Sequence, residues 1–271
     1  MLKFRNCLGK CSVIGMIHVL PLPGTPNFSG SVTDIIEVAK KEALIYKNEQ
    51  VDGVLIENMH DIPYLRAKSL TPETTALMTR VATEVRNILP KSVKCGVQVL
   101  AGGNLQALAV AQAAELDFLR AEGFVFGHVA DEGYIDACAG ELLRYRKRLD
   151  AENILIFTDI KKKHSSHAIT EDISLVETAH AAKFFQSDGI ILTGGATGSP
   201  ADKNQLKDLK SNAKVPVIIG SGVDIDNIED YMEADAFIIG SHFKEENNVN
   251  PFVELFRPVL REEKNRKVLT R

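Results

Sequence analysis

The chain has 271 residues, of which 45% are hydrophobic and 25% are charged, as in an ordinary globular protein. Its 32 Lys and Arg against 36 Asp and Glu give a net charge of −4, which excludes the basic surface that nucleic acids and anionic membranes require. No apolar run approaches the roughly 20 residues of a membrane span, and the composition excludes disordered, collagen-like, coiled-coil and disulfide-stapled chains. We expect one domain over 1–271, with an N-terminal extension at 1–11 and a C-terminal tail at 262–271.

Short β-branched runs, each bounded by Gly, Asp or Pro, recur along the chain. Several of them, such as GIILTG and AFIIGS, are almost wholly apolar, which is typical of parallel strands buried on both faces. The expected strands are 12–17, 53–57, 93–100, 117–121, 153–159, 189–193, 215–220 and 236–240.

Helix signals fill the gaps between these strands. Thr71, Pro72 and Glu73 supply a capping residue, a first-turn proline and an acid, and Ser31 and Thr170 begin two other helices. The expected helices are 31–50, 71–89, 104–115, 132–149, 171–186, 202–212 and 225–233, with a last helix from about 251.

This alternation predicts a (β/α)8 barrel, the TIM barrel, because eight βα units fill a chain of this length. A doubly wound sheet is the alternative, but the glycine fingerprint of dinucleotide-binding sheets is missing after the first strand, which continues IGMIHVLPLPG. In a TIM barrel the loops after the carboxyl ends of the strands build the active site. Polar residues at those ends are therefore the candidates for function.

Glycine-rich segments follow the last three expected strands. Glycines let the backbone approach an oxyanion, and the loops after strands seven and eight are the usual phosphate site of this barrel. The alternative is that these glycines only permit tight turns. We predict a site for phosphate or a similar anion, with the candidates Thr193, Gly194, Thr197, Gly198, Gly220, Ser221, Gly222, Gly240, Ser241 and Lys244.

A second group of candidates follows the fifth expected strand, in TDIKKKH. Strand alternation puts Asp159 and Lys161 on one side, with Lys163 as well if the strand continues. An Asp beside a Lys in the barrel mouth suits proton transfer, and a desolvated Lys can form a Schiff base. The alternative is a solvated basic loop, which we expect for Lys162. His164 is a candidate for ligand binding.

Strands two to four also end in polar residues. VLIEN places Glu57 and Asn58 at the mouth of an apolar strand, and Gln98 on the third strand can form hydrogen bonds. FLRAEGF puts Arg120 and Glu122 on one face of the fourth strand. These two either form a buried ion pair that fills the barrel or act in catalysis, with Arg120 stabilising an oxyanion.

His18 follows the first strand, where it is an acid–base group, a metal ligand or a support for a proline-rich loop. The histidines and acids show no metal-site spacing, so we predict no metal site and imply no cofactor, while a divalent metal stays open. Neither a Ser-His-Asp order nor a G-x-S-x-G segment occurs, which argues against serine-type acyl transfer.

The four cysteines, Cys7, Cys11, Cys95 and Cys138, are too few and too scattered for a disulfide framework, so reduced thiols are expected. The first dozen residues are basic and faintly resemble a transit peptide, but the first strand begins so early that little remains to cleave. We therefore predict a cytoplasmic protein, with an organelle such as the mitochondrion as the alternative.

The segments IGMIHVLPLPGTP, VDGVLIENMHDIPY, DFLRAEGF, TDIKKKH, LTGGATGSP and VIIGSGVDIDNIEDYMEADAFIIGSHFK together resemble the BtpA/SgcQ family, in order, over about residues 12–260. The resemblance implies a ribulose-phosphate-binding type of barrel, with phosphate at the loops of Gly220–Gly222 and Gly240–Ser241. The family pattern also covers His18, Glu57, Asn58, Arg120, Asp159, Lys161 or Lys163, His164, Thr193, Gly194, Thr197 and Gly198. The third-strand segment GVQVLAGGN departs from the family's usual GVNVLRND.

Two functions are consistent with this pattern. The first is an enzyme acting on a small phosphorylated metabolite, such as a sugar phosphate, by isomerisation, epimerisation or aldol-type cleavage. The second is a non-catalytic binding or assembly factor that retains the anion site, because the barrel fold alone does not imply catalysis. In either case we expect a small phosphorylated ligand, neither nucleic acid nor a membrane span, and a homo-oligomer on general frequency.

Overall fold

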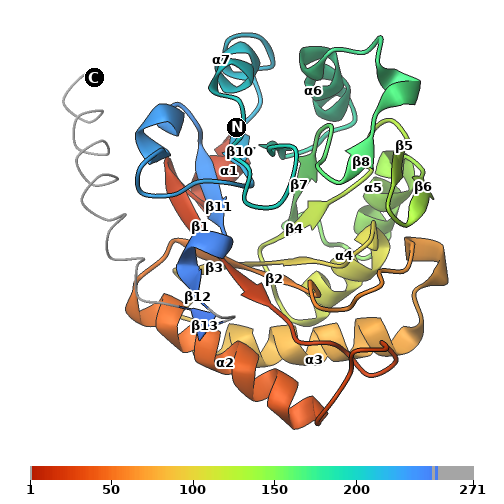
Figure 1. The fold of residues 1–271 in the computed structure, drawn as a ribbon, viewed down its shortest axis with the longest axis vertical. Helices are drawn as coiled ribbons and strands as arrows, with labels where there is room; N and C mark the ends of the chain where they lie inside the picture. The colour runs from red at the N-terminus through yellow and green to blue at the C-terminus, as the bar shows by residue number, and fades with distance from the viewer. Residues whose placement is uncertain (1, 246–247, 250–271) are drawn as a thin grey trace.

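The computed structural model describes residues 2–245 and 248–249, in which eight parallel strands close into a barrel (Figure 1). Around the barrel the strands follow the order β1-β11-β10-β9-β7-β4-β3-β2. This architecture confirms the predicted TIM barrel and rules out the doubly wound alternative. The strands are β1 (Ser12–His18), β2 (Gly53–Glu57), β3 (Lys94–Gln98), β4 (Phe118–Ala121), β7 (Leu155–Asp159), β9 (Gly189–Leu192), β10 (Val217–Ile219) and β11 (Ala236–Ile239).

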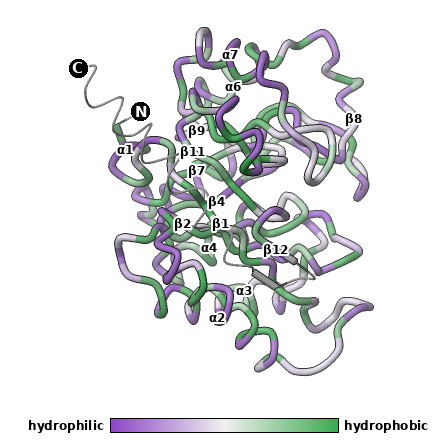
Figure 2. Tube along the Cα trace, turned by 60° about the vertical axis from the view of Figure 1, so that its left-hand side comes forward, coloured by the Kyte–Doolittle hydropathy of each residue, from purple (hydrophilic) through white to green (hydrophobic). Residues whose placement is uncertain are grey.

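The barrel strands are apolar because both of their faces are buried. Side chains that point inward form one apolar cluster, which includes Phe118 and Phe157 with ring centroids 5.2 Å apart. Gly96 leaves room for this packing, since a Cβ there would lie 2.1 Å from the Phe118 ring. Outward side chains pack beneath the helices, so Figure 2 shows hydrophobic segments gathered along the central strands.

Helices cover the outside of the barrel between successive strands (Figure 1). They are α2 (Val32–Asn48), α3 (Pro72–Ile88), α4 (Asn104–Ala113), α5 (Ala139–Arg148), α6 (Leu175–Phe184) and α7 (Lys203–Asn212), with short 3₁₀ turns η1 (Ala67–Ser69), η2 (Ala168–Thr170), η3 (Ile228–Tyr231) and η4 (Ser241–Phe243). Only a 3₁₀ turn stands where a helix was expected at 225–233. The helix expected from 251 and the tail at 262–271 lie outside the described residues. Over the described part of the chain, no helix has both the length and the hydrophobicity to cross a membrane.

Two expected helix starts are wrong. The helix expected from 132 begins at Ala139, because the chain before it forms the hairpin of β5 (His128–Ala130) and β6 (Gly133–Ile135). β8 (Ser165–Ser166) adds a third strand to this small sheet, beside β5. The helix expected at Thr170 begins after Ser174, whose hydroxyl accepts the N–H of Glu177 in a capping box. A last antiparallel pair, β12 (Lys244–Glu245) and β13 (Asn248–Val249), follows the barrel.

The predicted extension at 1–11 contains a helix, α1 (Leu2–Cys7), that packs into the barrel. Phe4 on this helix is 1% exposed and belongs to the apolar cluster inside the barrel. Its ring centroid lies 5.4 Å from that of Phe157 on β7. The helix therefore closes the end of the barrel where the strands begin.

Four aspartates lie at the same end of the barrel. Every second barrel strand along the chain is preceded directly by one of them. Asp52, Asp117, Asp188 and Asp235 precede β2, β4, β9 and β11. Each carboxylate accepts a backbone N–H of the neighbouring strand, from Val13, Cys95, Ile156 and Val217 at 2.9–3.0 Å. Asp117 also pairs with Arg86 and Lys94, Asp188 with Arg146, and Asp235 with Lys210. The carboxylates link the strands in pairs.

Candidate functional site

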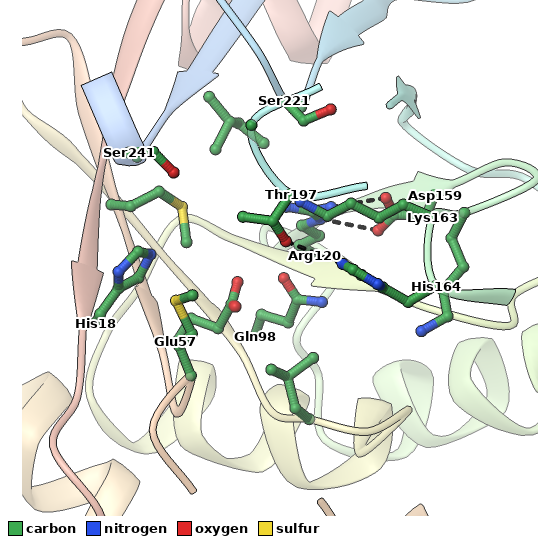
Figure 3. A pocket seen from close by; sticks show the side chains of 18 of the residues that line it. His18, Glu57, Gln98, Arg120, Asp159, Lys163, His164, Thr197, Ser221 and Ser241 are labelled. Atoms are coloured by element: carbon green, nitrogen blue, oxygen red, sulfur yellow. Dashed lines mark hydrogen bonds and ion pairs between the residues drawn. The ribbon is translucent and has the colours of Figure 1, made fainter. Parts of the chain in front are cut away.

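A cavity of about 520 Å³ opens at the carboxyl ends of the barrel strands, where the sequence places its candidates. Its wall receives side chains or backbone from most of the barrel strands and the loops after them (Figure 3). The predicted residues that line it are His18, Glu57, Gln98, Arg120, Asp159, Lys163, His164, Thr197, Gly198, Gly220, Ser221, Gly222, Gly240 and Ser241.

Arg120 and Asp159 form a buried ion pair across two neighbouring strands, β4 and β7. The guanidinium donates from Nε and Nη2 to the two carboxylate oxygens, each at 2.8 Å. Burial opposes the charge of the guanidinium, but the Asp159 carboxylate outweighs it and raises the pKa of Arg120. Because both oxygens of Asp159 already bind Arg120, this carboxylate fixes the position of the guanidinium in the cavity wall.

The lysines after β7 point in different directions. Lys161 has a φ of 42°, which breaks the strand alternation, and its Nζ donates to the Thr170 carbonyl at 3.0 Å, outside the cavity. The prediction that Asp159 and Lys161 share a side is therefore wrong. Lys163 lines the cavity, and burial, followed by the nearby Arg120, lowers its pKa.

Lys162 is buried and not solvated, contrary to the prediction. Its Nζ lies 3.1 Å from Glu122, and both side chains are less than a tenth exposed. Glu122 was expected either to pair with Arg120 or to act in catalysis, but it pairs with Lys162 and also accepts the N–H of Gly102 at 3.1 Å. The sequence-based reading missed this contact because Lys162 and Glu122 are 40 residues apart.

Glu57 ends β2 between two other cavity residues, with His18 beside it on β1 and Gln98 on β3. Glu57 as a whole is 9% exposed. Burial raises the pKa of Glu57, although Arg120 and Lys163 both act in the opposite direction. The group is thus closer to holding a proton near neutral pH than an ordinary glutamate.

His18 lies in the cavity wall as a neutral imidazole. Burial and then the nearby charge of Lys244 lower its pKa to about 3. Lys244 itself, a predicted anion ligand, does not line the cavity, because its Nζ lies 2.9 Å from both carboxylate oxygens of Glu42 on α2. Both side chains are less than a tenth exposed, and the ion pair joins the chain after η4 to α2.

The two glycine loops form the side of the cavity at β10 and β11 (Figure 3). Gly222 has a φ of 67°, and a Cβ there would lie 2.3 Å from the Ser199–Pro200 backbone, so only glycine fits. A Cβ on Gly220 would lie 3.7 Å from Arg120 Nη2, which places the guanidinium beside this loop. A positive group thus lies next to a backbone that a ligand can approach closely.

Three other predicted ligands lie behind the cavity wall. The Gly194 N–H donates to Ser221 Oγ at 2.8 Å, and Thr193 Oγ1 accepts the Lys163 N–H at 3.3 Å. Asn58 is fully buried and accepts the Leu100 N–H at 2.7 Å. These residues fix loops that line the cavity and do not line it themselves.

The hairpin of β5 and β6 contributes cavity residues that the sequence-based reading missed. Asp131 and Glu132 stand at its turn and line the cavity, as do Asp224, Tyr64 and His242 from other loops. The sequence-based prediction assigned residues from 132 onward to a helix and therefore missed the hairpin, although Gly133 is typical of a turn. Over residues 2–245 and 248–249, no group of three or more His, Cys, Asp or Glu side chains is arranged to hold a metal ion.

Several solved structures share this fold. The fold is similar to KGPDC from Streptococcus mutans in complex with D-R5P, with a TM-score of 0.60 at 11% identity over 93% of this chain and 98% of that one. It is also similar to thiamine phosphate pyrophosphorylase from Pyrococcus furiosus, with a TM-score of 0.57 at 15% identity over 96% and 98% of the two chains. These likenesses agree with the closed eight-stranded barrel described above: the protein is a TIM barrel.

The chain belongs to the BtpA family, whose model matches residues 9–260 and confirms the resemblance in the sequence. An uncharacterized mitochondrial protein of Caenorhabditis elegans is 48% identical over 86% of this chain and 84% of its own length. The photosystem I biogenesis protein BtpA of Synechocystis is 34% identical over 90% of this chain and 84% of its own.

Proposed function

We propose that the protein is an enzyme that moves a proton on a small phosphorylated metabolite. The reaction is an isomerisation or epimerisation, which begins when a base removes the carbon-bound proton next to a carbonyl, or an aldol-type cleavage, in which a base takes the hydroxyl proton as the carbon–carbon bond breaks and the enolate is then protonated. The observation that carries this proposal is that Glu57 and Lys163 line the same cavity and have pKa values shifted in opposite directions. The pKa of the Glu57 carboxyl is raised, and the pKa of the Lys163 amine is lowered. Such a divergence is characteristic of acid–base catalysts.

The phosphate is held at the loops of Gly220–Gly222 and Gly240–Ser241. Support comes from the close approach that glycine permits and from the positive charge of Lys163 and Arg120 near the same loops. The names of the structural neighbours, which include a phosphoribosyl anthranilate isomerase from Thermus thermophilus, agree with a phosphorylated ligand. A ligand of that size fits a cavity of about 520 Å³.

In the reaction, Glu57 takes the proton from carbon and Lys163 exchanges a proton with the reacting oxygen. Arg120 stabilises the negative charge that develops on that oxygen, and Asp159 keeps the guanidinium in place through their paired hydrogen bonds. This assignment turns Asp159 from the proton carrier expected from the sequence into a positioning residue. Neutral His18 is a further hydrogen-bonding group beside Glu57.

Phosphate binding is tested by thermal unfolding in inorganic phosphate. Binding to the folded state alone raises the Tm, by roughly 5 °C at a hundredfold excess over Kd. Lys163→Met should abolish the shift, whereas Lys161→Met should keep it, because Lys161 points away from the cavity. If neither phosphate nor any sugar phosphate moves the transition of the unaltered protein, the anion site does not exist.

Catalysis is tested by exchange of carbon-bound hydrogen in D₂O, followed by NMR over a panel of pentose and hexose phosphates. At least one compound should exchange, and Glu57→Gln should slow it by about 10²–10⁴-fold while preserving the phosphate-dependent Tm shift. An unchanged rate in Glu57→Gln would remove this residue from catalysis. A phosphate shift without exchange or product from any compound favours the second function.

That second function is a non-catalytic binding or assembly factor, favoured by the name of the Synechocystis relative as a photosystem I biogenesis protein. The name of the C. elegans relative likewise favours the mitochondrion over the cytoplasm that the sequence-based reading preferred. Imaging of a fluorescently tagged chain decides the compartment. A homo-oligomer stays a proposal, for which light scattering gives the mass in solution.

A further inference from the structure

The two sides of the cavity differ in chemistry, and the barrel order sets them opposite each other. With eight strands in the order β1-β11-β10-β9-β7-β4-β3-β2, β3 stands across from β10 and β4 across from β11. Gln98 at the end of β3 therefore faces the loop of Gly220, and Glu122 after β4 faces the loop of Gly240. Figure 3 shows Glu57 and Gln98 together on the side away from Ser221 and Ser241.

The side of Gln98 offers hydrogen-bond acceptors that the protein does not use. Gln98 is 2% exposed, and its Oε1 has no partner among the described residues. Glu132 Oε2, from the β5–β6 hairpin, is likewise buried and without a partner there, and Glu57 lies beside Gln98 in the same wall. Burying an acceptor without a donor is unfavourable, so such groups indicate where a ligand supplies donors.

The same side is acidic. Glu57, Glu122, Asp131 and Glu132 line the cavity, and Lys162 is already paired with Glu122. Lys163 comes from the loop after β7 and lies between this side and the glycine loops (Figure 3). A carboxylate of a ligand would meet like charge here, which is unfavourable, whereas hydroxyl groups would satisfy the idle acceptors.

We infer that the ligand is a phosphorylated polyhydroxy compound, bound with its phosphate at the glycine loops and its hydroxyl-bearing end against Gln98, Glu57 and Glu132, and that compounds with a carboxylate at that end are rejected. This inference rests on the proposed function for the phosphate end. Gln98 is the specificity-determining residue, because its amide recognises the hydroxyl end without carrying charge.

The test compares four probes by calorimetric titration at one salt concentration. Inorganic phosphate measures the anion site alone, and 1-pentyl phosphate adds a chain without donors. Ribitol 5-phosphate adds hydroxyls on a chain of the same length, and 5-phosphoribonate replaces the terminal hydroxymethyl with a carboxylate. We expect ribitol 5-phosphate to bind about tenfold more tightly than both 1-pentyl phosphate and 5-phosphoribonate.

Gln98→Met keeps the side-chain length but removes the amide, so it should lose the tenfold preference for ribitol 5-phosphate and keep the affinity for inorganic phosphate. Gln106→Met is the matched control. Gln106 also has a buried Oε1 without a partner among the described residues, but it lies on α4 outside the cavity. This control should leave all four affinities unchanged.

The outcomes separate the two proposals. If none of the probes binds, the proposed phosphate site fails. If inorganic phosphate binds but ribitol 5-phosphate gains nothing over 1-pentyl phosphate, or 5-phosphoribonate binds as tightly as ribitol 5-phosphate, the hydroxyl subsite is wrong while the phosphate site stands. The ligand series on the unaltered protein decides this even if Gln98→Met fails to fold.

Discussion

The carboxyl group of Glu57 occupies a position that opposes stability. It is buried at the barrel mouth, and burial raises its pKa above that of the unfolded chain. Below the unfolded pKa near 4.5 the group is protonated in both states and has no effect. As the pH rises, the unfolded chain ionises first, so the cost to folding grows until the folded pKa is passed and is then constant. Active-site groups of this kind lower stability in return for reactivity.

Glu57→Gln should therefore stabilise the protein at neutral pH while it slows the proposed reaction. The expected gain is about 1 kcal/mol, or roughly 2–4 °C in Tm, and it should disappear below pH 4.5. Thermal unfolding between pH 4 and 8 measures it. Glu37→Gln, at an exposed salt bridge with Lys40 on α2, is the control and should change the stability by less than about 0.5 kcal/mol. A Glu57→Gln variant less stable than the natural chain at pH 8 would contradict this account.

At the scale of elements, the sequence predicts the strands better than the segments between them. The eight runs match the eight barrel strands to within a few residues, because long-range burial on both faces leaves a strong apolar signal. The hairpin of β5 and β6 and the helix α1 leave no such signal, since they are short and partly exposed. Of the two candidate lysines, Lys163 lines the cavity and Lys161 does not, because a positive φ at Lys161, which the strand pattern does not reveal, ends the alternation.

The start of α6 gives a test of the capping assignment. Ser174→Ala removes the hydroxyl that accepts the Glu177 N–H and should cost about 1 kcal/mol. Thr170→Ala, at the start expected from the sequence, removes only a 3.3 Å hydrogen bond to the His167 carbonyl and should cost less than half as much. Denaturant unfolding of the two variants compares them directly. Equal costs would mean that the helix start is not set by Ser174.

For the whole molecule, the four aspartates before alternate strands show how the barrel is joined at the closed end. Each bonds the strand that precedes its own in the chain, so strands are linked in the pairs β1–β2, β3–β4, β7–β9 and β10–β11. The repeat is visible in the sequence as VDG, LDF, SDG and ADA. The aspartate link thus repeats once in every two βα units of the eight-unit barrel.

Asp188→Ala should destabilise the protein by about 3 kcal/mol, because it leaves Arg146 buried without its partner and frees the Ile156 N–H. Adding Arg146→Met should restore part of the loss, since it removes the unpaired charge. Calorimetric Tm values of the single and double variants measure the coupling. Independent, additive effects would show that the ion pair contributes nothing to this joint.

The helix α1 fills the amino end of the barrel with Phe4, and this affects how a ligand can enter and leave the cavity. Over the described part of the chain, this packing leaves the cavity open at the carboxyl ends of the strands. In the proposed reaction, the reactant and the product would pass through this same opening. A product that keeps its phosphate would have to leave the glycine loops before the next reactant binds, so product release would be a step of every turnover.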